Sequence, residues 1–144
     1  MSIKFYQADR AVFLPQKRKL KKFLSSMFVA EGVPLSLLTY IFCSDEYLLG
    51  VNQKFLNHNY YTDIITFCLN NVYEPINGEI YISVDRVKEN ALTLQQGLQL
   101  ELHRVIFHGA LHLCGFNDKS LKQKQLMTEK ENEYLRKYFG STNL

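Results

Sequence analysis

The positions of apolar residues along the chain predict an alternation of strands and helices. Alternating or compact apolar runs predict strands over residues 2–6, 37–43, 63–69 and 79–84. Apolar residues at helical spacing predict helices over about residues 16–28, 45–56, 85–94, 98–114 and 121–138, with N-caps at Ser44 and at Ser83 or Asp85. The irregular order of these elements favours a small α+β domain, with one mixed four-stranded sheet flanked by about five helices, over a doubly wound sheet.

Length and composition limit what this chain can be. With 144 residues, 47% hydrophobic and 22% charged, residues 1–144 are expected to form one domain with a real core rather than a disordered chain. No apolar run approaches the ~20 residues that span a bilayer, and the N-terminus lacks signal-peptide features, so no membrane association is expected. Three cysteines without a CxxC pair indicate reduced thiols and a cytoplasmic protein. A net charge of +3 does not require nucleic acid but is compatible with a local basic surface.

The helix predicted in the C-terminal third carries two histidines on an otherwise apolar segment. Residues 105–114 are apolar or glycine except for His108 and His112. Because these two lie four positions apart, their imidazoles emerge on one helical face within reach of a shared ion. A buried imidazole needs a partner, and this spacing is typical of a two-histidine metal site.

A third metal ligand is expected from beyond the end of this helix. Asp118 would point away on a continued helix, but a left-handed Gly115 can reverse the chain and return the carboxylate to the imidazoles. Two nitrogens and one carboxylate suit a single zinc ion with an open position for water, and iron or manganese is chemically possible too. The alternative is that both histidines are hydrogen-bonded core residues. A His-Glu-x-x-His peptidase is disfavoured, because Gly109 stands where its glutamate base belongs.

The segment around the histidines resembles the signature of the YbeY family of bacterial rRNA maturation factors. The match is Phe-His-Gly-Ala-Leu-His-Leu-Cys-Gly-Phe over residues 107–116. Residues 55–57 and 62–67 are similar to the family's Leu-Asn and Thr-Asp-Val-Leu-Ser-Phe blocks, and residues 78–83 to its Gly-Asp-Ile-x-Ile-Ser strand. Glu101, Leu102, Met127 and Glu131 also fall where the family has them. The order and spacing of these blocks extend the resemblance over nearly the whole chain.

The resemblance implies a single mixed sheet flanked by helices, one Zn²⁺ ion per chain, and a metal-dependent endoribonuclease specific for single strands. The implied role is 16S rRNA 3′-end maturation and ribosome quality control in the cytoplasm, with rRNA and the ribosome or small-subunit proteins as partners. The oligomeric state is left open.

Three departures from the family pattern bear on the expected chemistry. The family's third zinc ligand is a histidine preceded by aspartate, whereas this chain has Asn117-Asp118, which predicts a weaker site or one of altered selectivity. The stretch at residues 58–61 is shortened relative to the family's Tyr-Arg segment and lacks its arginine, so charge stabilisation must come from elsewhere or is reduced. Glu79 replaces an aspartate, which is a milder change.

The sequence also offers candidate residues for proton transfer and for RNA contact. Either Glu79 or Asp63 is a candidate proton handler or orienting group, against the alternatives of an edge carboxylate and a turn aspartate. RNA contacts are expected from basic side chains just after the metal segment and from two tyrosine rings that can stack on bases, namely Lys119, Lys122, Lys124, Tyr60 and Tyr61. The alternative for the two tyrosines is that their rings are buried or partly buried. A second hypothesis is a non-catalytic ribosome-assembly factor that binds rRNA or a ribosomal protein and carries a structural metal.

Overall fold

A four-stranded mixed sheet forms the centre of the computed structural model, which describes residues 2–140. Its strands are β1 (Ser2–Gln7), β2 (Leu35–Cys43), β3 (Ile64–Cys68) and β4 (Ile76–Ser83), in the order β1-β2-β4-β3. Strands β1, β2 and β4 run parallel, and β3 runs antiparallel to β4 at one edge. The predicted mixed four-stranded sheet is therefore confirmed.

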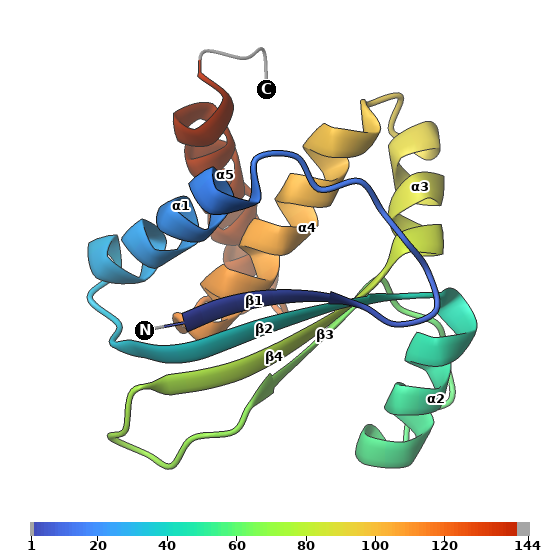
Figure 1. Ribbon diagram of the computed structural model, residues 1–144, viewed down its shortest axis with the longest axis horizontal. Coiled ribbons are helices and arrows are strands. Elements are labelled where there is room, and N and C mark those ends of the chain that lie inside the picture. The colour runs from blue at the N-terminus through green and yellow to red at the C-terminus, as the bar shows by residue number, and fades with distance from the viewer. Residues whose placement is uncertain (1, 141–144) are drawn as a thin grey trace.

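Five helices complete the described chain and cover the two faces of the sheet unequally. They are α1 (Lys17–Ala30), α2 (Asp45–Leu56), α3 (Val84–Thr93), α4 (Leu98–Leu113) and α5 (Leu121–Phe139). Helices α1, α3, α4 and α5 lie on one side of the sheet, whereas α2 lies on the other side near one end (Figure 1). Within residues 2–140, no helix combines the length and hydropathy needed to cross a membrane.

Local sequence signals set the starts of three helices, two of which, at Ser44 and Ser83, were predicted. The Ser44 hydroxyl accepts a hydrogen bond from the Tyr47 amide at 3.0 Å and caps α2. Ser83 caps α3 by accepting from the Arg86 amide at 3.1 Å, and Ser120 forms a capping box at the start of α5. The largest boundary difference is at β4, which begins at Ile76 rather than Glu79 because its first residues pair with β2.

The core lies between the sheet and α4, which packs unusually close to it. The buried side chains of Leu38, Ile80 and Ile82 from the sheet share one cluster with Phe107 of α4. Gly109 makes the approach possible, because a Cβ atom there would lie 2.9 Å from Ile80 Cδ1 and 3.0 Å from Ile64 Cδ1. The absence of a side chain at this position thus fixes the helix that carries both histidines directly on the sheet.

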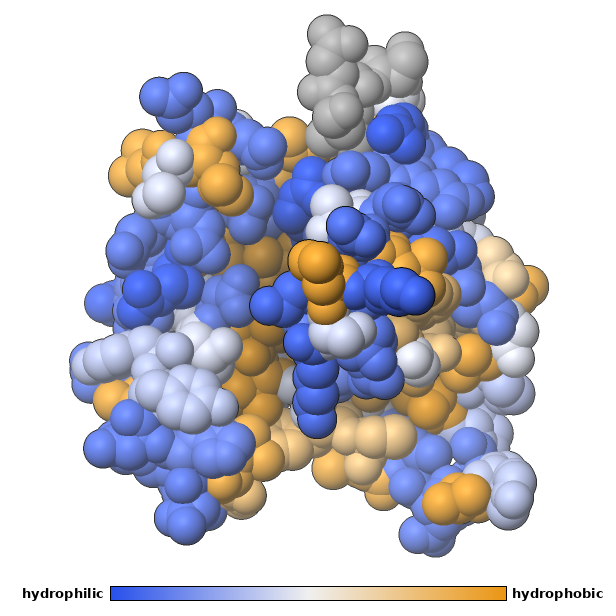
Figure 2. All heavy atoms as spheres, turned by 180° about the vertical axis from the view of Figure 1, so that it is seen from behind, coloured by the Kyte–Doolittle hydropathy of each residue, from blue (hydrophilic) through white to orange (hydrophobic). Residues whose placement is uncertain are grey.

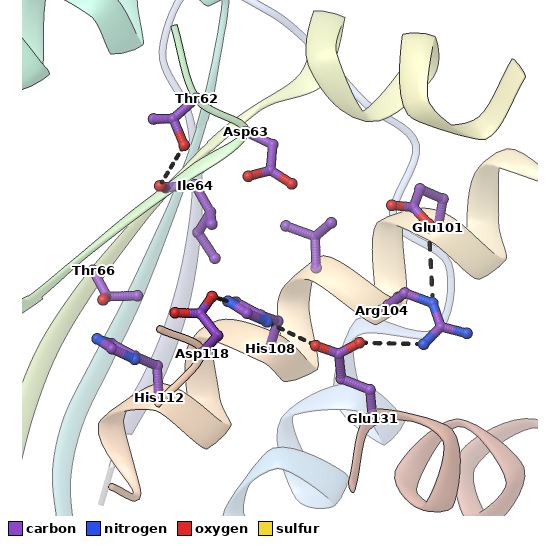
Figure 3. Close-up of a pocket in the computed structure, with 11 residues that line it drawn as sticks. Thr62, Asp63, Ile64, Thr66, Glu101, Arg104, His108, His112, Asp118 and Glu131 are labelled. Atoms are coloured by element: carbon purple, nitrogen blue, oxygen red, sulfur yellow. Dashed lines mark hydrogen bonds and ion pairs between the residues drawn. The ribbon is translucent and has the colours of Figure 1, made fainter. Parts of the chain in front are cut away.

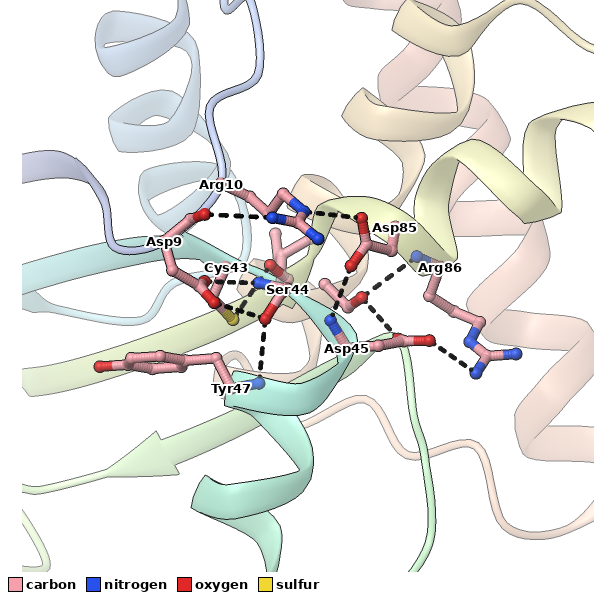
Figure 4. Close-up of polar contacts among 10 residues, drawn as sticks. Asp9, Arg10, Cys43, Ser44, Asp45, Tyr47, Asp85 and Arg86 are labelled. Atoms are coloured by element: carbon pink, nitrogen blue, oxygen red, sulfur yellow. Dashed lines mark hydrogen bonds and ion pairs between the residues drawn. The ribbon is translucent and has the colours of Figure 1, made fainter.

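A polar network joins the carboxyl ends of the parallel strands to α2 and α3 (Figure 4). Asp9, just beyond β1, accepts hydrogen bonds from the amide and the hydroxyl of Ser44 at 2.8 and 2.5 Å. Asp85 accepts from the Asp45 amide at 3.0 Å, and the Asp45 carboxylate pairs with Arg86 at 2.9 Å. These contacts hold the starts of both helices together at one end of the sheet.

Seen from behind, hydrophilic side chains cover most of the surface, and apolar side chains show in a hollow between two parts of the molecule (Figure 2).

The buried imidazole of His103 is expected to make stability depend on pH. The side chain is 1% exposed; Nδ1 donates to the Gln99 carbonyl at 2.7 Å, and buried Nε2 has no partner within residues 2–140. Burial lowers the pKa of His103 below its usual 6.5. Between about pH 6.5, where His103 titrates in the unfolded chain, and its lower pKa in the folded protein, the unfolded chain binds more protons. The free energy of unfolding therefore falls as the pH is lowered through this range.

The measurement is the free energy of unfolding in urea between pH 5 and 8, as the difference between the wild type and His103→Phe. The difference between the two proteins isolates His103, because the contributions of the other titrating groups are common to both proteins and cancel. A difference that does not change with pH in this range would contradict the expectation.

Candidate functional site

A pocket of about 410 Å³ opens between the edge strand β3 and helix α4. Its lining combines titratable and apolar side chains from β3 and the loop before it, from α4 and α5, and from the loop between them (Figure 3). They are Thr62, Asp63, Ile64, Thr66, Glu101, Arg104, Val105, His108, His112, Asp118 and Glu131. The pocket thus gathers all three predicted metal ligands.

Both histidines are oriented by hydrogen bonds at Nδ1. The Nδ1 atom of His108 lies 2.7 Å from a carboxylate oxygen of Glu131, and Nδ1 of His112 lies 3.1 Å from the Phe116 carbonyl. Because a carboxylate and a carbonyl only accept, each Nδ1 carries the proton and the neutral ring has its lone pair on Nε2. This is the arrangement in which an imidazole can bind a metal through Nε2 while a neighbouring group fixes its orientation.

The loop after α4 returns Asp118 to His108, by the chain reversal that Gly115 predicts. Gly115 has a φ of 107°, a left-handed conformation that favours glycine, and the Phe116 amide bonds back to the Leu111 carbonyl at 3.1 Å. Asp118 Oδ2 then lies 3.4 Å from His108 Nε2. Within residues 2–140, no three His, Cys, Asp or Glu side chains form a ready-made set of metal ligands, so metal binding stays a prediction.

A carboxylate and a guanidinium behind the histidines were not assigned roles from the sequence. Glu131 of α5 bridges two residues of α4: its Oε2 contacts His108, and its Oε1 lies 3.2 Å from Arg104 Nη1. Arg104 Nε also lies 4.0 Å from Oε1 of the buried Glu101. The signal for Arg104 was present, because Arg104, His108 and His112 recur every four residues on one helical face. The role of Glu131 required the packing of α5 on α4.

Burial and neighbouring charge shift the pKa values in the pocket. Burial raises the pKa of Asp63 above its usual 3.8 and that of Glu101 above its usual 4.5. Burial lowers the pKa of His108, but the hydrogen bond and charge of Glu131, together with Asp118 and Asp63, outweigh it, and the net pKa is raised above 6.5. The carboxyl groups outnumber the single guanidinium, so the pocket attracts a cation.

The structure separates the two candidate proton handlers. Asp63 lines the pocket with the histidines. Glu79 does not, because side chains alternate along β4: Gly78 and Ile80 face α4, so Glu79 points to the other face, where Tyr81 donates to it at 3.4 Å. Of the two carboxylates, only Asp63 lines the pocket that holds the histidines, so Glu79 is discarded as a catalytic candidate.

The predicted RNA-contacting rings lie just before the pocket and are held in place. The Tyr60 ring stacks on the His58 ring with centroids 5.1 Å apart. The backbone carbonyl of Tyr60 accepts a hydrogen bond from the side-chain amide of the buried Asn52 at 2.9 Å. The Tyr61 hydroxyl donates to Glu46 at 2.6 Å. Both rings are about half exposed, at 56% and 47%. The rings therefore present fixed, accessible faces.

The predicted basic residues Lys119, Lys122 and Lys124 are exposed on the loop after α4 and the first turn of α5. They flank Asp118 in the sequence but do not line the pocket.

A small α+β domain with a pocket of oriented histidines and carboxyl groups has the layout of a hydrolytic enzyme. Comparison with known proteins gives the particular family: residues 4–139 match the family model described as Endoribonuclease YbeY. The chain therefore belongs to the YbeY family, and the resemblance found in the sequence is confirmed.

Several relatives support the same assignment over most of their length. The chain is 46% identical to Endoribonuclease YbeY of Cytophaga hutchinsonii, over 93% of this chain and 94% of the relative. It is 41% identical to Endoribonuclease YbeY of Parabacteroides distasonis, over 94% of each chain. The solution structure of TM1509 from Thermotoga maritima aligns with a TM-score of 0.62 and 25% identity, covering 96% of this chain and 89% of that one. The predicted class, an enzyme that hydrolyses RNA, is thus confirmed at the level of the family.

Proposed function

We propose that this protein is a metal-dependent endoribonuclease that cleaves single-stranded RNA in rRNA maturation, including the 3′ end of 16S rRNA, and in ribosome quality control. Membership of the Endoribonuclease YbeY family supports RNA cleavage. The observation that carries the metal dependence is the pair of histidines whose Nδ1 atoms are engaged and whose Nε2 atoms are left to bind a cation beside Asp118. A cytoplasmic location and partners among rRNA, the ribosome and small-subunit proteins belong to the same proposal.

The donor set fits one zinc ion, which His108, His112 and Asp118 would hold. Two imidazole nitrogens and a carboxylate oxygen are ligands that zinc accepts, and three protein ligands leave a position for water. Bound zinc supplies an acidified water and a positive charge for a phosphodiester. The fit is also electrostatic, because the carboxyl groups of the pocket would otherwise repel a phosphate.

The protein's own residues have distinct tasks in the proposed reaction. Asp63, whose pKa burial raises, is placed to accept and return a proton closer to neutral pH than an exposed aspartate. Glu131 holds the His108 ring in one orientation and neutralises Arg104. Tyr60 and Tyr61 offer faces on which unpaired bases stack, and the lysines at 119, 122 and 124 offer charges for phosphates.

Cleavage of a defined RNA with and without a chelator tests the proposal. The purified full chain is incubated with an end-labelled single strand and with the same strand annealed to its complement. Cleavage of the single strand is expected to disappear on chelation and to return when zinc is added, while the duplex is spared. Cleavage that persists at full rate in chelator would contradict the metal dependence.

The second candidate is a non-catalytic ribosome-assembly factor with a structural metal. One observation favours it: Arg104, the guanidinium in the pocket, is already paired with Glu131 and lies near Glu101, so it does not freely replace the arginine of the family pattern. If chelation lowers the melting temperature but no RNA is cut with any divalent metal, this reading replaces the first.

A further inference from the structure

The outer edge of β3 presents a row of backbone groups toward the pocket side of the molecule. Ser83 donates to the Asp63 carbonyl at 2.9 Å, and the Leu69 amide donates to the Asn77 carbonyl at 2.7 Å, so the odd-numbered residues of β3 bond to β4. The amides and carbonyls of Ile64, Thr66 and Cys68 therefore point away from the sheet. Within residues 2–140 no backbone group pairs with them, and Thr62 alone reaches one, the Ile64 carbonyl, at 3.3 Å.

This edge also lacks three features that proteins use to block strand addition, namely a charged side chain, a proline and a bulge. The sequence of β3 is Ile-Ile-Thr-Phe-Cys, without a charge or a proline, and its register with β4 is continuous, without a bulge. By contrast, the opposite edge strand β1 carries the exposed Lys4. An unprotected edge is a template for another strand.

The chemistry of the edge and its surroundings favours polypeptide over RNA. Amides and carbonyls alternate along β3, and an extended peptide satisfies both, whereas an RNA backbone offers acceptors and few donors. Ile64 and Thr66 of this strand line the pocket together with four carboxyl groups, of Asp63, Glu101, Asp118 and Glu131, and one guanidinium, of Arg104. Arg104 pairs with Glu131, so the carboxyl groups remain in excess. A second copy of the chain would bring two such acidic pockets together. A segment rich in lysine or arginine complements them instead.

We propose that the outer edge of β3 binds an extended, basic segment of a partner polypeptide, which adds to the sheet as a fifth strand beside the pocket. The partner's backbone would pair with Ile64, Thr66 and Cys68, and its basic side chains would face the carboxyl groups. Binding of this segment does not depend on RNA cleavage by the pocket, so either can fail without the other.

Thr66→Pro removes one outward amide without removing any bond to β4. Proline is tolerated in an edge strand where its missing N–H faces outward, and the residue before it keeps an extended conformation. Thr66→Ala is the matched control, because it changes the side chain but keeps the amide. Circular dichroism and thermal melting check that both variants fold.

The test is fluorescence titration of the full chain with a labelled eight-residue peptide of alternating lysine and valine. The wild type and Thr66→Ala should bind alike, and Thr66→Pro should bind about tenfold more weakly, because a blocked edge loses backbone pairing. Equal affinity for Thr66→Pro and Thr66→Ala would overturn the proposal.

Peptides methylated on alternate backbone nitrogens give a second test that needs no variant of the protein. Methylation of one alternate set should abolish binding and methylation of the other should be tolerated, because only one set faces β3. Equal effects of both sets would show binding by charge alone and overturn the proposal. If the wild type self-associates and Thr66→Pro abolishes this, the proposal is overturned and the edge binds a second copy of the chain. If Thr66→Pro loses binding of single-stranded RNA but keeps binding of the peptide, the proposal is overturned and the edge binds RNA.

Discussion

Replacing His108 with alanine is expected to lower RNA cleavage at least about a hundredfold, because the variant loses one of two imidazoles that would hold the catalytic metal. Metal content should fall with it, from about one zinc per chain toward zero. Secondary structure should persist, since the side chain is 22% exposed and lies at the wall of a pocket rather than in the core. Cleavage rates under single-turnover conditions, elemental analysis and circular dichroism measure the three quantities.

Two further variants, at Glu131 and Glu129, add an intermediate effect and a control to this experiment. Glu131→Gln keeps the shape of the group that orients His108 but removes its charge, and it should reduce metal affinity about 10- to 100-fold. Glu129→Gln is the matched control, because Glu129 is exposed on the same helix and does not line the pocket. Full cleavage by His108→Ala, with zinc retained, would contradict the proposed site.

The Gly109→Val substitution is expected to destabilise the protein by about 2–3 kcal/mol, because overpacking a well-packed core costs about that much. A Cβ at this position would lie 2.9 Å from Ile80 Cδ1 and 3.0 Å from Ile64 Cδ1, so α4 would have to move away from the sheet. The free energy of unfolding from urea titrations measures the effect. The helix also carries His108 and His112, so metal affinity should fall as well.

Gly50→Val provides the matched control on another helix. Gly50 is exposed on α2, and a Cβ there would meet nothing within 4 Å, so this variant should be neutral or slightly more stable than wild type. Ile80→Val, which removes the methyl nearest to the new side chain, should recover part of the loss in a double variant with Gly109→Val. If Gly109→Val and Gly50→Val change the free energy of unfolding equally, the position of α4 does not depend on its close approach to the sheet at Gly109.

The close approach at Gly109 also explains why this chain does not carry the His-Glu-x-x-His arrangement of peptidases. A glutamate at this position would meet the sheet rather than the pocket. The glycine that weakened a peptidase interpretation of the sequence is therefore required by packing.

The sequence by itself determined the elements and the core of the site, because these depend on interactions between near neighbours in the chain. Helical spacing placed His108 and His112 on one face, and the glycine at 115 predicted the reversal that returns Asp118 to His108. The caps at Ser44 and Ser83 followed from local hydrogen bonding in the same way.

Only the tertiary structure decided which distant groups support that site. Glu131 reaches His108 and Arg104 because α5 packs against α4, a contact that no local pattern specifies. Glu79 is excluded because it lies on the face of the sheet opposite α4 and the pocket. Helix α2 packs on part of that face, so hydrophobic alternation along β4 did not reveal which face belongs to the pocket. Contacts between elements depend on how whole surfaces fit together, and that information becomes available only when the chain is packed.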